Sequence, residues 1–237
     1  MKAIKGIMAA AALLIVDAHG GPSLLIGGGV NFSSMSDEDS IPIEKTMRAG
    51  YNAGLAFEQN FGRYFSFLTG FSFETRGQSE KRTIAYANGT EISDQDVNMR
   101  YCQIPLRAQF NMPVGPFRFS VCAGPEMGVF LSAKKQRTLQ IQLPPAIITQ
   151  SDTTDFSKDV NMLDFGVTAG ASFEITAGPG AIFLQPGYYC GLTDFLDNKR
   201  ATQSGADPAG RHTSIYARIG YKVNWGRAGS RACMRDH

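Results

Sequence analysis

The stretch YFSFLTGFSFETRGQ, Tyr64–Gln78, alternates between two registers of unlike residues. Phe stands at positions 65, 67, 71 and 73, with Thr69 in the gap. The opposite register holds Tyr64, Ser66, Leu68, Gly70, Ser72, Glu74 and Arg76. A period of two is that of a β-strand whose two faces differ. In a soluble sheet the apolar face would form the core and the polar face would meet water. Which face lies inside therefore depends on what surrounds the sheet.

Alternation or strand composition recurs along the chain. The strand segments are residues 23–33, 46–58, 64–78, 97–111, 117–132, 161–175, 180–193 and 212–225. The connections at 60–63, 112–116 and 176–179 are short and rich in Gly or Pro, as tight hairpin turns require. The stretches 34–45, 77–96, 133–160 and 194–211 are long and polar, and we predict them as loops.

Short turns that alternate with long loops are typical of a transmembrane β-barrel with periplasmic turns and extracellular loops. The sequence therefore predicts an all-β fold, an eight-stranded antiparallel up-and-down transmembrane β-barrel over residues 21–225 of the 237. Its Phe face would contact lipid and its Gly, Ser, Glu and Arg face would lie inside. The alternative is a soluble lipocalin-like barrel that turns its apolar face inward around a ligand.

The predicted interior carries a set of polar and charged side chains. They are Glu74, Arg76, Gln103, Arg107, Gln109, Arg118, Glu126, Asp164, Glu174 and Arg218. They could line a narrow pore for small solutes, or they could pair with one another and fill the interior. Because eight strands enclose just enough space for side chains, we favour the filled interior.

Aromatic residues near the predicted short-turn ends are typical of the girdle at a membrane interface. They are Phe61, Tyr64, Phe110, Phe117 and Trp225. We predict that they mark the periplasmic edge of the barrel.

The start of the chain predicts export. Lys2 and Lys5 precede an apolar run over residues 7–16, followed by small residues, which indicates a signal peptide at 1–20. We expect residues 226–237 to form a periplasmic tail.

Cys102 and Cys122 belong to opposite registers of neighbouring strands, so no bridge is expected between them. A net charge of +2 offers no footprint for nucleic acid.

Several strands resemble those of the PorT-like outer-membrane β-barrel family of Bacteroidetes-type bacteria. YCQIPLRAQF at 101–110 is similar to its Tyr-x-x-Ile-Pro-Leu strand, DFGVTAGASFE at 164–174 to its Asp-x-Gly strand, and YYCGLTDF at 188–195 to its Tyr-x-x-Gly-Leu-Thr strand. The resemblance implies an eight-stranded porin-like barrel in the bacterial outer membrane, whose namesake helps to assemble a protein-secretion system. Two departures are Gly187, where members often carry Arg, and the tail that follows Trp225.

The preferred function is a structural or partner-binding scaffold that acts through the stretches 77–96 and 133–160. Expected partners are outer-membrane lipid, the barrel-assembly machinery and an envelope or extracellular protein, but not nucleic acid. An enzyme of the outer rim could use His212 and Ser214, yet a single His beside a loop is usually a surface residue. The sequence carries no HExxH or GxSxG motif. We therefore predict neither an enzyme, nor a cofactor, nor a metal.

Overall fold

The computed structural model describes residues 21–36, 44–86, 89–143, 146–194 and 210–224. The predicted signal peptide, the predicted tail and Trp225 lie outside these residues. The strands are β1 (Pro22–Ser36), β2 (Glu44–Phe61), β3 (Phe65–Tyr86), β4 (Gly89–Val114), β5 (Phe117–Leu143), β6 (Ala146–Asp155), β7 (Leu163–Ala177), β8 (Gly180–Gly191) and β9 (Arg211–Asn224), with a single 3-10 turn, η1 (Ser157–Asp159), among the described residues.

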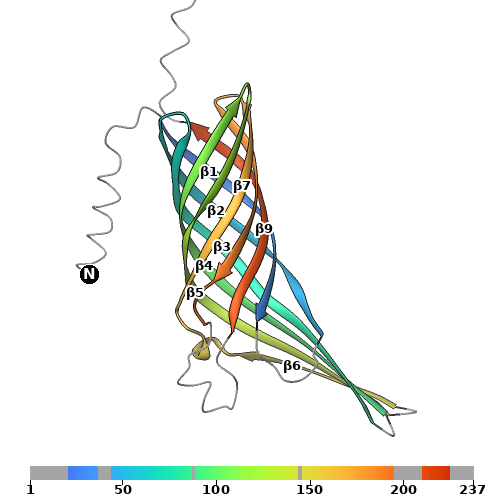
Figure 1. The fold of residues 1–237 in the computed structure, drawn as a ribbon. Helices are drawn as coiled ribbons and strands as arrows, with labels where there is room; N and C mark the ends of the chain where they lie inside the picture. Colours follow the sequence, from blue (N-terminus) through green and yellow to red (C-terminus); the bar gives the residue numbers. More distant parts are fainter. Residues whose placement is uncertain (1–20, 37–43, 87–88, 144–145, 195–209, 225–237) are drawn as a thin grey trace, which may run out of the picture.

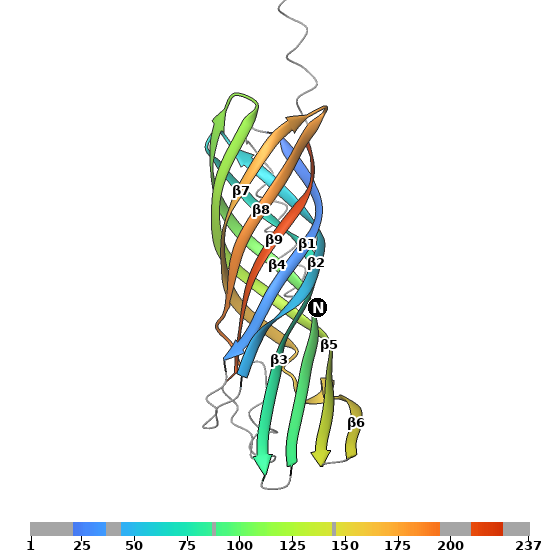
Figure 2. The ribbon, with the colours of Figure 1, turned by 90° about the vertical axis from the view of Figure 1, so that its right-hand side faces the viewer.

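The strands form one antiparallel sheet that closes on itself. The hydrogen-bonded order is β4-β3-β2-β1-β9-β8-β7-β5-β6, and an additional pairing of β4 with β5 closes the ring. Eight strands therefore form the barrel, and β6 pairs with β5 outside it (Figures 1 and 2). Each predicted strand segment corresponds to one barrel strand, so the predicted eight-stranded barrel is confirmed.

Three tight turns join strands at one end of the barrel. Each turn contains a glycine with positive φ: Gly62 at 75°, Gly115 at 59° and Gly178 at 61°. An L-residue with a side chain rarely adopts these angles, which explains the Gly-containing connections between β2 and β3, β4 and β5, and β7 and β8. By the convention of such barrels, this short-turn end is periplasmic.

The apolar face of the sheet points outward. In β3, Phe65 is 60% exposed and Phe71 is 64% exposed, whereas Ser72, Glu74 and Arg76 are buried inside the ring. The same arrangement holds around the barrel, where Ile, Val, Leu and Phe side chains are exposed and polar side chains are buried. A soluble barrel with an apolar interior is therefore the wrong alternative.

Two stretches predicted as loops are strands. Residues 77–96 fall in the outer halves of β3 and β4, and residues 133–160 fall largely in β5 and β6. The prediction was wrong because these stretches are polar on both faces, so the hydrophobic period of two disappears once the chain leaves the lipid. The sequence does carry an Asn-Gly pair at 88–89, a strong hairpin signal, and β4 begins at its Gly89.

The outer halves of β3, β4 and β5, together with β6, form a sheet that runs past the end of the barrel, which we call the projecting sheet (Figures 1 and 2). Registers such as Thr83↔Ile92, Ile92↔Gln140 and Gln140↔Thr149 run continuously across its four strands. The lipid-side face of β3 thus changes from Phe to Ser, Lys and Thr, which indicates where the hydrocarbon ends.

No helix within the described residues is long and apolar enough to cross a membrane.

Candidate functional site

Four charged residues form a group near the short-turn end of the interior, which we call the lower tetrad. The Glu58 carboxylate accepts hydrogen bonds from Arg118 at 2.7 Å and from Lys222 at 2.6 Å. The Glu174 carboxylate accepts from the same two cations at 2.6 Å and 3.3 Å. Two cations and two anions therefore neutralise one another, as a charge removed from water requires.

An apolar cluster lies directly against the lower tetrad. Leu25, Leu68 and Phe183 are buried there, with Ala56 packed against them. Each of the three lies opposite a tetrad residue in the sheet: Leu25 faces Lys222, Leu68 faces Glu58 and Phe183 faces Glu174. The ring of Phe183 also occupies the space where Cβ atoms at Gly27 and Gly220 would lie. Glycine at both positions lets this ring extend across the interior.

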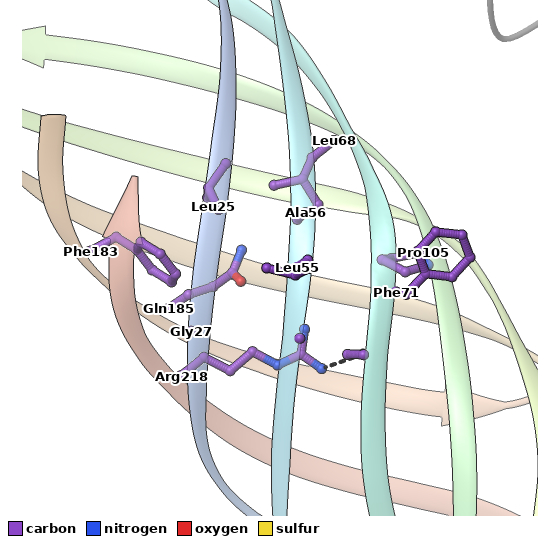
Figure 3. Close-up of a pocket in the computed structure, with 12 residues that line it drawn as sticks. Leu25, Gly27, Leu55, Ala56, Leu68, Phe71, Pro105, Phe183, Gln185 and Arg218 are labelled. Carbon is purple, nitrogen blue, oxygen red and sulfur yellow. Dashed lines mark hydrogen bonds between the residues drawn. The ribbon is translucent and has the colours of Figure 1, made fainter. Parts of the chain in front are cut away.

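A small cavity lies beside this cluster (Figure 3). Its volume is about 40 Å³, and its lining includes Phe183, Gln185, Ser72 and Arg218. Arg218 donates to Ser72 at 3.3 Å and to Asn52 at 2.9 Å. A cavity of this size holds a few waters at most.

A second ionic group lies further from the short turns and is centred on Arg76. Its guanidinium contacts Asp164 at 3.1 Å, Glu74 at 3.2 Å and Glu126 at 3.7 Å. Arg107 donates to the second oxygen of Glu126 at 2.7 Å. Arg218 forms no ion pair among the described residues, but it lies over the Tyr216 ring at 4.8 Å, as Arg107 does at 5.6 Å. With Arg218 counted, the upper group has three arginines and three carboxylates. Among the described residues, no ion pair links it to the lower tetrad.

Aromatic and amide side chains complete the shell around Arg76. The guanidinium carbon lies 3.7 Å from the centre of the Tyr189 ring, and the Tyr189 hydroxyl donates to Asp164 at 2.8 Å. With its amide oriented so that the oxygen faces the guanidinium, Gln103 accepts from Arg76 at 3.0 Å. Tyr101 is fully buried, with its ring 5.6 Å from Arg76. Arg76 is therefore enclosed by groups that favour its charge.

An apolar cap covers the extracellular end of the interior. Met35, Val97, Met99, Tyr101, Ala133 and Val160 form a buried cluster, with Phe130 and Phe156 packed against it. The segment around η1 brings Phe156 and Val160 to this cluster. The Ser157 hydroxyl anchors that segment because it accepts from the Ala133 N–H at 2.9 Å and donates to the Ala133 carbonyl at 3.3 Å.

Every residue predicted for the interior points inward. Glu74, Arg76, Gln103, Arg107, Gln109, Glu126, Asp164 and Glu174 are buried, while Arg118 and Arg218 are partly buried. The two ionic groups and their shells also include residues that the sequence did not predict there, namely Glu58, Lys222, Tyr101 and Tyr189. Glu58 and Lys222 do stand in the inward register of their strands, but both lie near strand ends, where the alternation is short.

His212 differs from its predicted surface position. It is fully buried inside the barrel, and its Nε2 lies 3.2 Å from the Tyr101 hydroxyl. The prediction was wrong because His212 begins the inward register of β9 rather than the loop before it. Ser214, two residues on, also points inward, with its hydroxyl 3.5 Å from Glu74.

The aromatics predicted for the interface lie near the short turns. Phe61, Tyr64, Phe110 and Phe117 are between 37% and 48% exposed. The rings of Tyr64 and Phe110 stack with centres 6.3 Å apart, and Phe65 meets Phe110 edge-on at 5.3 Å.

The cysteines within the described residues are free. Cys122 is buried inside the barrel, whereas Cys102 and Cys190 are partly exposed. Among the same residues, no group of three or more His, Cys, Asp or Glu side chains is placed to hold a metal ion.

The closed barrel with an outward apolar face agrees with comparison to known families. A family model described as the outer membrane protein beta-barrel domain matches residues 23–197. The chain belongs to this family. Members of the outer-membrane barrel family reside in the bacterial outer membrane, and this chain accordingly has the bacterial outer membrane as its location.

Several solved structures of outer-membrane proteins are similar to this chain, at low sequence identity. Ail, the attachment invasion locus protein of Yersinia pestis, is 14% identical with a TM-score of 0.38, over 86% of this chain and 99% of that one. OprG from Pseudomonas aeruginosa is 11% identical with a TM-score of 0.38, over 86% and 96%. The outer membrane protease OmpT from Escherichia coli is 8% identical with a TM-score of 0.30, over 87% and 96%. No protein with a curated description matches the chain.

Proposed function

We propose that the protein is a closed, non-conducting outer-membrane barrel that holds the projecting sheet outside the cell as a binding surface. The observation that carries this proposal is the contrast between the two parts. The barrel interior is occupied by two neutral ionic groups, an apolar cluster and an apolar cap. The projecting sheet, by contrast, leaves polar side chains on strands such as β6 exposed.

The filled interior argues against a narrow solute pore. A solute would have to displace Leu68 and Phe183 near the periplasmic end and the cap around Met99 at the other. It would also have to separate buried ion pairs. Each broken pair leaves a buried charge without its partner, at a cost of about 3–5 kcal/mol.

A non-enzymatic role is part of the proposal. His212 is buried beneath the cap, and Ser214 points into the barrel, so neither reaches a lipid or a surface substrate in this arrangement.

Planar-bilayer recordings test whether the barrel is closed. We expect purified protein to insert without stepwise conductance in 1 M KCl. A double variant, Leu68→Gly with Phe183→Gly, removes two of the three buried side chains of the apolar cluster and should raise conductance in protein that shows the heat-modifiable folded form. Stable channels from the native protein would contradict the proposal.

Photo-cross-linking on intact cells tests the binding surface. A photoreactive residue at Thr83 or Gln150, both exposed on the projecting sheet, should yield a discrete product, whereas one at lipid-facing Phe71 should yield only lipid adducts. A role in secretion-system assembly, which the PorT-like resemblance suggests, requires that the product be a protein of that system. The absence of any product specific to the projecting sheet would contradict the proposal.

A further inference from the structure

A polar recess of about 200 Å³ lies on the projecting sheet. Glu80, Arg82, Ile84, Glu91, Ser93, Gln95 and Arg137 line it. These residues share the face that continues the barrel interior, because Gln78 and Val97, opposite each other and buried, stand in the same register. The recess therefore lies beyond the lipid, on strands β3, β4 and β5.

Two arginines converge in this recess. Arg82 is paired directly with Ser93 in the sheet, and the Nε of Arg137 donates to the hydroxyl of the same Ser93 at 3.2 Å. Both arginines are exposed. Neither forms an ion pair with a carboxylate anywhere in the part of the chain that the structure describes. Their guanidinium groups thus retain donors for a ligand.

The two carboxylates of the recess are held by neutral donors instead. The oxygens of Glu80 accept from Gln78 at 2.7 Å and from Gln95 at 3.3 Å. Glu91 accepts from the Tyr86 hydroxyl at 3.1 Å, and this hydrogen bond raises the pKa of Tyr86. Each carboxylate oxygen has further lone pairs, so both groups can accept hydroxyl donors from a ligand.

We propose that this recess binds an anionic saccharide, a sugar unit that bears a phosphate or a carboxylate. Two guanidiniums and two carboxylates nearly cancel, so a bare anion gains little from the summed field. A sugar acid or sugar phosphate fits both the arginines and the carboxylates of the recess. Its anionic group accepts hydrogen bonds from the guanidinium groups of Arg82 and Arg137, and its hydroxyls donate to Glu80 and Glu91. Ile84 supplies an apolar wall for the C–H face of the ring.

This proposal rests on the proposed function, since it names the chemistry that the projecting sheet would bind. The anion could come from the phosphorylated core sugars of the same outer membrane or from a uronic-acid glycan outside the cell. Both sources present the same chemistry to Arg82 and Arg137.

Calorimetric titration of the full chain in detergent micelles tests the site. The probes are a deacylated lipopolysaccharide core oligosaccharide with its phosphates, the same oligosaccharide after phosphatase treatment, a galacturonic-acid oligomer, and inorganic phosphate. Because a charged hydrogen bond contributes about 1.5–3 kcal/mol, Arg82→Ala and Arg137→Ala should each weaken binding at least about tenfold.

Lys81→Ala and Lys134→Ala are matched controls. They remove the same charge from β3 and β5, but Lys81 is adjacent to Arg82 and Lys134 is three residues from Arg137, so both occupy the opposite face. Binding should stay within about twofold of native in these variants. Equal losses in arginine and lysine variants would reduce the effect to net charge and overturn the proposal.

The probes separate the remaining outcomes. Preference for the phosphorylated oligosaccharide assigns the site to the cell's own surface, and preference for the galacturonic-acid oligomer assigns it to an external glycan. Saccharide recognition would be refuted if inorganic phosphate bound as tightly as the phosphorylated oligosaccharide. It would also be refuted if neither arginine variant weakened the binding of any probe. In that case a cross-linked product at Thr83 would still support the binding surface itself, so the two proposals fail separately.

Discussion

Replacing Glu126 by Ala should be among the most damaging single changes to the barrel interior. Glu126 is 3% exposed and accepts from the Nη2 of Arg107 at 2.7 Å. The Nε and Nη1 of Arg107 have no hydrogen-bond partner among the described residues. Glu126 thus supplies the carboxylate contact of this buried guanidinium, whereas Arg76 would keep Glu74 and Asp164.

Glu174→Ala is the matched control, because Glu174 is 4% exposed and loses the same atoms. Its partners Arg118 and Lys222 would both keep Glu58, at 2.7 Å and 2.6 Å. The side chain of Arg118 is also 18% exposed, so water can replace part of the lost contact. We expect a loss of about 3–5 kcal/mol for Glu126→Ala. For Glu174→Ala, the loss of charged hydrogen bonds predicts about 1.5–3 kcal/mol.

The assay is reversible urea unfolding of protein refolded into short-chain phosphatidylcholine vesicles. The folded fraction is read from the mobility difference between boiled and unboiled samples, and linear extrapolation gives the free energy of unfolding. A Glu126→Leu, Arg107→Met double variant should recover most of the loss, because apolar residues of similar volume often replace a buried ion pair without penalty.

Equal losses for Glu126→Ala and Glu174→Ala, within about 0.5 kcal/mol, would refute the argument from unpaired charge. The same conclusion would follow if the double variant were as unstable as Glu126→Ala alone. Either result would mean that water or rearrangement satisfies Arg107, and that the interior is more open than its side-chain packing indicates.

Three further perturbations test other parts of the molecule. Phe71→Lys should cost about 2–4 kcal/mol in vesicles if its position lies near the bilayer midplane, whereas Thr83→Lys, beyond the lipid on the same strand, should change the unfolding free energy by less than about 0.5 kcal/mol. Gly220→Val should prevent most of the chain from reaching the heat-modifiable folded form, because a Cβ there would collide with the Ile26 carbonyl and the Phe183 ring. Tyr189→Phe should lower the unfolding free energy by about 1.5–3 kcal/mol, since it removes one charged hydrogen bond.

The barrel strands could be predicted because lipid imposes a local rule. A strand that contacts hydrocarbon on one face and a polar interior on the other must alternate residue by residue, as Phe71, Ser72, Phe73 and Glu74 do. The projecting sheet obeys no such rule. Thr83 and Ile84 both belong to a strand, but water contacts both faces of this part of the sheet. Its sequence therefore shows no hydrophobic period of two, and a loop was predicted there.

Local sequence therefore determines which residues form the barrel strands and which face meets lipid, because adjacent side chains on a strand point to opposite sides wherever the strand lies. It leaves open which interior charges meet. Lys222 and Glu58 are 164 residues apart, and Arg76 and Asp164 are 88 apart. Closure and strand register bring each pair within hydrogen-bond distance. The cap depends on tertiary structure in the same way, since Val160 reaches Met35 only after the ring has closed.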